Sequence, residues 1–156
     1  MSGWPLAWDE LVEEARSGRG RPVLVDSTGD TGRLFDAIAP RFDLTVSLGS
    51  AVARAETLAD FERALLWPPG SLLLVDLDIL FAPQLAVDVV AMLRRRSQLG
   101  LVVAAWPGQI EGGRVTYSLA GRPDHVDEPA RGLVVLRPVS THFPDEVPYT
   151  VERYPA

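Results

Sequence analysis

The stretch Pro22-Val23-Leu24-Val25-Asp26-Ser27-Thr28-Gly29-Asp30-Thr31-Gly32-Arg33-Leu34 sets the expected fold of this chain. Its first five residues are a short apolar run closed by Asp26, the pattern of a buried strand. A glycine-containing loop follows over residues 27–32, and a short helix is predicted over 33–39, limited by Pro40. Strand, loop and helix in this order form the opening unit of an α/β domain.

The rest of the chain continues this alternation. Further strands are predicted over 44–48, 72–76, 101–106 and 132–136, and helices over 6–16, from a capping box that begins at Thr57, and over 84–97. Apart from residues 44–48, these strands are continuously apolar rather than alternating, which indicates a mostly parallel sheet covered on both faces. Gly112-Gly113 predicts a hairpin turn, and residues 138–156 are expected to run over the surface.

Composition excludes several chemistries. The chain has 156 residues, no cysteine and no lysine, so all 15 cationic side chains are arginine. A Schiff base or a lysine-activated nucleophile needs an amine that deprotonates, and thiol or Cys-ligated metal chemistry needs cysteine. The net charge of -6 argues against broad binding to a phosphate backbone, so any nucleic-acid contact is expected to be indirect. No leader or membrane-spanning run is recognised, and a cytoplasmic protein with no membrane association is expected.

The loop after the first strand has the setting of a phosphate-binding loop, G-x-x-x-x-G-K-[ST] between a strand and a helix. In the register Ser27, Thr28, Gly29, Asp30, Thr31, Gly32, Arg33, Leu34, only Gly32 matches a defining position. Ser27 replaces the first glycine, Arg33 the lysine and Leu34 the hydroxyl that holds magnesium. Leucine cannot coordinate a hard cation, and Asp30 adds negative charge. Residues 27–33 are therefore either a remnant phosphate loop or an ordinary βα turn.

Acidic residues close the apolar strand over 72–76. An aspartate at such a strand end organises magnesium in P-loop ATPases, so Asp76 and Asp78 are the candidate metal ligands. The alternative is that Asp76 caps a turn. Arg94-Arg95-Arg96 lies near a helix end, where it is either solvated or a nucleic-acid contact. His125, His142 and the four tryptophans carry no defensible catalytic arrangement, although Trp4, Trp8, Trp67 and Trp106 can serve as core or interface residues.

Three blocks in the second half of the chain support a resemblance. They are the strand end with Asp78-Ile79-Leu80-Phe81-Ala82-Pro83, then Val102-Val103-Ala104-Ala105-Trp106-Pro107-Gly108, then Gly113-Arg114-Val115-Thr116-Tyr117 with Gly121-Arg122-Pro123-Asp124. Together, over about residues 22–124, the chain resembles the small P-loop protein of type III BREX phage-defence systems, BrxF. That resemblance implies a P-loop ATPase-like fold and partners such as a PglZ-like protein, a DNA methyltransferase and a helicase. The family's loop normally holds the lysine and hydroxyl that are missing here.

These observations give a set of expectations. The fold is a three-layer P-loop NTPase-like α/β domain over 1–124 that includes the N-terminal helix, with a C-terminal hairpin and strand extension over 125–156 packed on it. The function is that of a subunit of a BREX-like complex that acts through protein contacts, not an enzyme and without a cofactor. One alternative is a nucleotide-binding or weakly active ATPase that uses ATP and Mg²⁺, with Arg33 or a partner's arginine replacing the lysine. Another is an unrelated α/β interaction module.

Overall fold

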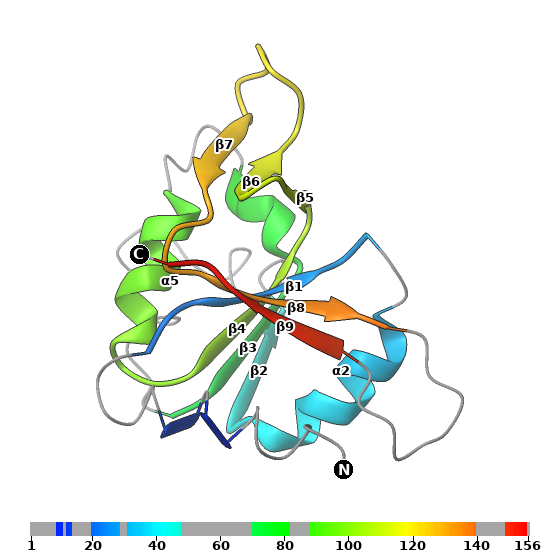
Figure 1. Ribbon diagram of the computed structural model, residues 1–156, viewed down its shortest axis with the longest axis vertical. Coiled ribbons are helices and arrows are strands. Elements are labelled where there is room, and N and C mark those ends of the chain that lie inside the picture. Colours follow the sequence, from blue (N-terminus) through cyan, green and yellow to red (C-terminus); the bar gives the residue numbers. More distant parts are fainter. Residues whose placement is uncertain are drawn as a thin grey trace.

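A computed structural model describes residues 9–10, 12–13, 20–28, 31–47, 70–81, 88–139 and 149–155. They form an α/β fold with a six-stranded sheet and a second, three-stranded antiparallel sheet (Figure 1). The strands of the main sheet have the order β2-β3-β4-β1-β8-β9. Their bounds are β1 Val23–Asp26, β2 Leu44–Ser47, β3 Leu72–Val75, β4 Val102–Trp106, β8 Val134–Pro138 and β9 Tyr149–Arg153.

The first five of these strands, β2, β3, β4, β1 and β8, are parallel, which confirms the predicted sheet. Strands β1, β3, β4 and β8 each carry apolar side chains toward both faces, as their continuous patterns required. On β1, Leu24 belongs to one buried cluster while Val23 and Val25 belong to the other. Both faces of the sheet are therefore covered, and the layered α/β prediction holds.

Two helices lie on opposite faces of the main sheet. Helix α2 (Gly32–Ile38) packs Leu34 and Ile38 into the cluster with Val23 and Val25. It ends where a 3-10 turn, Ala39–Arg41, begins at the predicted proline stop. Helix α5 (Val89–Ser97) packs on the other face, and Asp88 caps it by accepting a hydrogen bond from the Ala91 amide at 3.0 Å. A second 3-10 segment, Leu77–Phe81, follows β3.

The second sheet has the order β5-β6-β7, with bounds Gln109–Glu111, Arg114–Tyr117 and Val126–Pro129. Gly112 and Gly113 join β5 to β6 with φ of 59° and 73°, so the predicted hairpin turn is confirmed. This sheet is inserted between β4 and β8, and in Figure 1 it rises above the main sheet. Ile110 and Val115 attach it to the α5-side cluster.

The C-terminal part of the chain departs from expectation. We expected residues 138–156 to run over the surface, but residues 149–153 form β9, which pairs antiparallel with β8 along five residues. The aromatic ring of Tyr149 is buried in the α2-side cluster. The alternation of buried and exposed positions in β9 is short, and acidic and proline residues obscured it. Strand β8 lies between β1 and β9, so this part of the chain belongs to the same sheet as β1.

Several sequence predictions fall outside the described residues. They include the helix that starts at Thr57, most of the helix over 6–16 and residues 84–87 of the helix over 84–97. That last helix was also expected to include residue 88, but Asp88 is extended and α5 begins at Val89. The described residues of the N-terminal helix, 9–10 and 12–13, are helical. None of the helices in the described part of the chain is long and apolar enough to cross a membrane.

Candidate functional site: the loop after β1

The carboxyl ends of parallel strands meet at one edge of a sheet, where ligands of open α/β folds bind. Asp26 closes the central strand β1 at this edge, beside Trp106 at the end of β4. The loop that starts at Ser27 leads from this edge to α2, so the predicted strand, loop and helix are in the expected order. The side chain of Asp26 is only 11% exposed.

The Asp26 carboxylate is fully engaged. One oxygen, Oδ1, accepts hydrogen bonds from the Thr28 amide at 3.0 Å and from the Thr28 hydroxyl at 2.7 Å. The other oxygen, Oδ2, accepts from Arg137 Nη1 at 2.7 Å. Burial alone would raise the pKa of Asp26, but the bonds from Thr28 and the Arg137 charge outweigh it and lower the pKa. The Thr28 amide of the loop therefore donates to a carboxylate of the protein.

Arg137, on β8, connects four parts of the fold. Besides Asp26, its Nε donates to Glu152 Oε1 at 2.8 Å and its Nη2 donates to the Ile110 carbonyl at 2.8 Å. The Tyr154 hydroxyl donates to the other Glu152 oxygen at 3.0 Å. The hydrogen bond to Glu152 is the main reason that the pKa of Arg137 is raised, and the same bond lowers the pKa of Glu152. We call Asp26, Arg137 and Glu152 the carboxylate–arginine cluster; it links β1, β8 and β9 of the main sheet to β5.

The remaining loop positions are placed as follows. The Ser27 hydroxyl donates to the Val25 carbonyl at 3.4 Å, and Gly29 and Asp30 lie outside the described residues. Thr31 is the N-cap of α2 without a side-chain capping bond, and Gly32 and Arg33 are the first two residues of the helix. Leu34, which stands where a P-loop has its magnesium-binding hydroxyl, is completely buried. It fills the core between α2 and the sheet.

The two predicted metal ligands lie at the same edge of the sheet. Asp76 directly follows β3 in a left-handed conformation, with φ of 59°, and Asp78 is in the 3-10 segment. Both side chains are exposed. Within the described ranges, no group of three or more His, Asp or Glu side chains is arranged to hold a metal ion. The magnesium role of Asp76 and Asp78 stays a prediction.

The three sequence blocks behind the BREX resemblance meet at one place. The ring of Phe81 packs edge-on against Trp106 at 5.4 Å and stacks on Tyr117 at 4.0 Å between centroids. The indole N–H of Trp106 donates to the Thr116 carbonyl at 3.0 Å. A Cβ at Gly108 would lie 1.8 Å from that same carbonyl oxygen, so only glycine fits there. These residues seat the second sheet on the first, and Trp106 is a core residue.

The arginine run on α5 is solvated only in part, because Arg95 is exposed whereas Arg94 and Arg96 donate to loop carbonyls. A nucleic-acid contact by this run stays untested. Arg96 is only 2% exposed, and its guanidinium donates to the carbonyl groups of Gly70 at 2.5 Å and Gly100 at 3.4 Å. Arg94 donates to the Arg131 carbonyl at 2.7 Å. The helix-end argument used sequence position alone, and position on a helix does not reveal which side chains turn inward to satisfy loop carbonyls.

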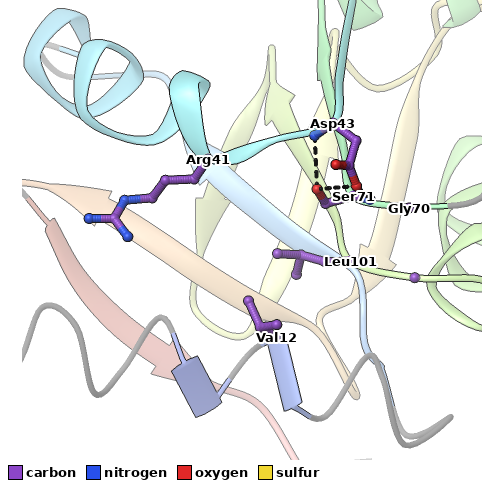
Figure 2. Close-up of a pocket in the computed structure, with 7 residues that line it drawn as sticks. Val12, Arg41, Asp43, Gly70, Ser71 and Leu101 are labelled. Atoms are coloured by element: carbon purple, nitrogen blue, oxygen red, sulfur yellow. Dashed lines mark hydrogen bonds between the residues drawn. The ribbon is translucent and has the colours of Figure 1, made fainter.

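A cavity of about 340 Å³ lies at the opposite, amino-terminal edge of the sheet. Figure 2 shows Val12 and Leu101 as its apolar side and the Asp43 and Ser71 pair as a polar side. Asp43 Oδ2 accepts from the Ser71 amide at 2.9 Å, and the Ser71 hydroxyl accepts from the Asp43 amide at 3.0 Å. These reciprocal bonds tie the start of β2 to the start of β3, a structural role.

Sequence reasoning missed Arg137 and Glu152. Arg137 lies 111 residues after Asp26 and follows an apolar strand, where an arginine ordinarily marks the strand end. The available signal was a charged residue next to a continuous apolar run, which places a cation at the carboxyl edge if the strand joins the parallel sheet. Comparison with known proteins adds no relative: the chain matches no protein-family model, no curated protein and no solved structure.

Proposed function

We propose that this chain is a non-catalytic, P-loop-like subunit of a bacterial anti-phage complex of the BREX type, and that it acts through protein contacts. The observation that carries the non-catalytic part is the closed start of the loop. Asp26 takes up the Thr28 amide and the nearest described cation, Arg137. A nucleotide would have to displace this buried carboxylate before the same groups could reach a phosphate.

The chemistry of nucleotide hydrolysis supports the same conclusion. Phosphoryl transfer depends on a lysine and loop amides around the phosphates and on a hydroxyl and an acid around Mg²⁺. This chain has no lysine, and the residue in the hydroxyl position, Leu34, is part of the core. The position of the loop after a central parallel strand, with Asp76 after β3 and one strand between them, is compatible with a P-loop domain. The chain therefore lacks the lysine and the hydroxyl that the hydrolysis reaction needs.

The defence role is supported by the resemblance of the three sequence blocks. Their convergence around Phe81, Trp106 and Tyr117 makes them one structural unit, which is what a shared fold would retain. By that resemblance, the expected partners are a PglZ-like protein, a DNA methyltransferase and a helicase. The nearest alternative is a nucleotide-binding regulator of the same complex, which the setting of the loop between β1 and α2 favours.

Two measurements test the proposal. The first is ATP turnover by the purified protein with Mg²⁺, compared with Asp76→Ala. We expect no turnover above the buffer background, and turnover that Asp76→Ala abolishes would refute the non-catalytic role.

The second is affinity purification of the tagged chain from its native host, with mass spectrometry of what copurifies. We expect one of the three named partner classes to be enriched over an unrelated tagged protein of similar charge. Recovery of the chain without any of these classes would contradict the defence assignment. Gly108→Ala serves as a fold-disrupting control, because a partner that recognises the native surface should be lost with it.

A further inference from the structure

Three donors converge on the Asp26 carboxylate at the carboxyl edge of the sheet. They are the Thr28 amide, the Thr28 hydroxyl and Arg137 Nη1, at 3.0, 2.7 and 2.7 Å. A backbone N–H, a hydroxyl and a guanidinium N–H are the donors with which proteins hold small oxyanions. The carboxylate that they hold here is the protein's own.

The contacts with Thr28 alone would be an ordinary aspartate turn. The arginine is a separate feature, because it is brought from a strand 111 residues away and held by two other partners. Glu152 accepts from its Nε, and the Ile110 carbonyl accepts from its Nη2, so the guanidinium is fixed in position independently of Asp26. Removal of the Asp26 side chain would therefore leave the guanidinium in place.

We propose that Thr28 and Arg137 form a site for a small oxyanion, and that the carboxylate of Asp26 fills it as an internal, autoinhibitory ligand. The class of ligand is an anion of carboxylate size. The inference deepens the proposed function and rests on it only in placing the closed site at the loop after β1. It names the contact that keeps external anions away from this edge.

The charges of the carboxylate–arginine cluster predict a graded response. With Asp26 and Glu152 ionised and Arg137 cationic, the native cluster carries a net charge of −1 and repels a second anion. Replacement of Asp26 by alanine leaves a neutral pair and an empty space of carboxylate size. An additional Glu152→Gln replacement leaves the single positive charge of Arg137, so anion binding should increase in the order native, Asp26→Ala, Asp26→Ala with Glu152→Gln.

The test is thermal unfolding of the full chain in sodium formate and in sodium phosphate, each against sodium chloride at equal ionic strength. For Asp26→Ala we expect the Tm to rise by about 3 °C at 100 mM formate, which corresponds to a Kd on the order of 10 mM. The native chain should show no difference from chloride. A response to formate alone or to both anions supports the site, and a response to neither overturns it.

Three control variants separate a site from a general salt effect. Asp26→Asn keeps the space filled and should give no formate response, and Asp26→Ala with Arg137→Met lacks the guanidinium and should give none. Asp127→Ala frees Arg114, whose ion pair at 2.6 Å is half exposed, and it should also behave like the native chain. A formate response in any of these variants would overturn the proposal.

If Asp26→Ala is unfolded in chloride, the same titration becomes a refolding test. Formate must then restore the circular-dichroism spectrum of the native fold, and failure to do so counts against the site. The outcome is independent of the hydrolysis assay: ATP turnover by the native chain would refute the proposed function, whereas an Asp26→Ala chain indifferent to formate would refute only this inference.

Discussion

Replacement of Arg137 by methionine removes three hydrogen bonds while keeping most of the volume of the side chain. The bond to Asp26 is mostly buried, with side chains 11% and 27% exposed, and its loss leaves a carboxylate without its cation. We assign it about 2 kcal/mol, a value for a hydrogen bond to a charged group. The bond from the guanidinium to the uncharged Ile110 carbonyl adds roughly 1 kcal/mol. The bond to Glu152, which is 41% exposed, adds at most about 0.5 kcal/mol.

The expected loss in the free energy of unfolding is therefore about 3 kcal/mol. Urea denaturation followed by tryptophan fluorescence measures it, and with an m-value of about 2 kcal/mol/M the midpoint should fall by about 1.5 M. Arg114→Met is the matched control, because it breaks an ion pair of similar length whose partners are 50% and 44% exposed. We expect that control to change stability by less than about 0.5 kcal/mol. Equal effects of the two replacements would refute the structural role given to Arg137.

Other predictions concern the core, the second sheet and pH. Leu34→Ser restores the hydroxyl of a P-loop but should destabilise the chain by about 3 kcal/mol in urea, because Leu34 is completely buried. Gly108→Ala should lower the Tm by about 10 °C, because its Cβ would collide with the Thr116 carbonyl. The corresponding loss in the free energy of unfolding is on the order of 3 kcal/mol. The pKa values of Asp26 and Glu152 are lowered in the fold, so their stabilisation is complete above their unfolded values of about 4 and is lost as the pH falls through the folded values. Urea midpoints measured between pH 5 and pH 2 should show that the native chain loses more stability than Arg137→Met.

The replacements of Leu34 and Gly108 each have a control variant in the chain. Leu119→Ser changes a side chain that is 68% exposed and should alter stability by less than about 0.5 kcal/mol. Gly112→Asn introduces a residue that tolerates a left-handed conformation, at a position where an added Cβ has no heavy atom within 4 Å. The Tm of this variant should stay close to the native value. If Leu34→Ser is as stable as the native chain, or if the two acid profiles coincide, the corresponding argument is wrong.

Local patterns in the sequence predicted strands β1, β2, β3, β4 and β8 and helices α2 and α5, because each depends on neighbouring residues. The apolar runs at β1, β3 and β4 had no alternation, and the sheet that buries both of their faces follows from that. Gly112-Gly113 specified a turn through its own backbone freedom. The proline at position 40 marked the end of α2 within two residues.

Contacts between distant residues could not be predicted in the same way. Arg137 reaches Asp26 only because β8 lies next to β1, and one sequence does not reveal the order of strands. The inward turn of Arg96 depends on two loop carbonyls that are brought together by the fold. The sequence did reveal the missing groups of the loop, because the absence of lysine and the presence of Leu34 need no structure to be recognised.

The central claim is that the loop after β1 is closed to nucleotides by the contacts of Asp26. A titration of the native chain with ATP, ADP and GTP in the presence of Mg²⁺, followed by thermal unfolding, tests it most directly, since a ligand that binds the folded state raises the Tm with its concentration. The account predicts a Tm that does not change up to millimolar nucleotide. A saturable, magnesium-dependent rise in Tm would contradict it.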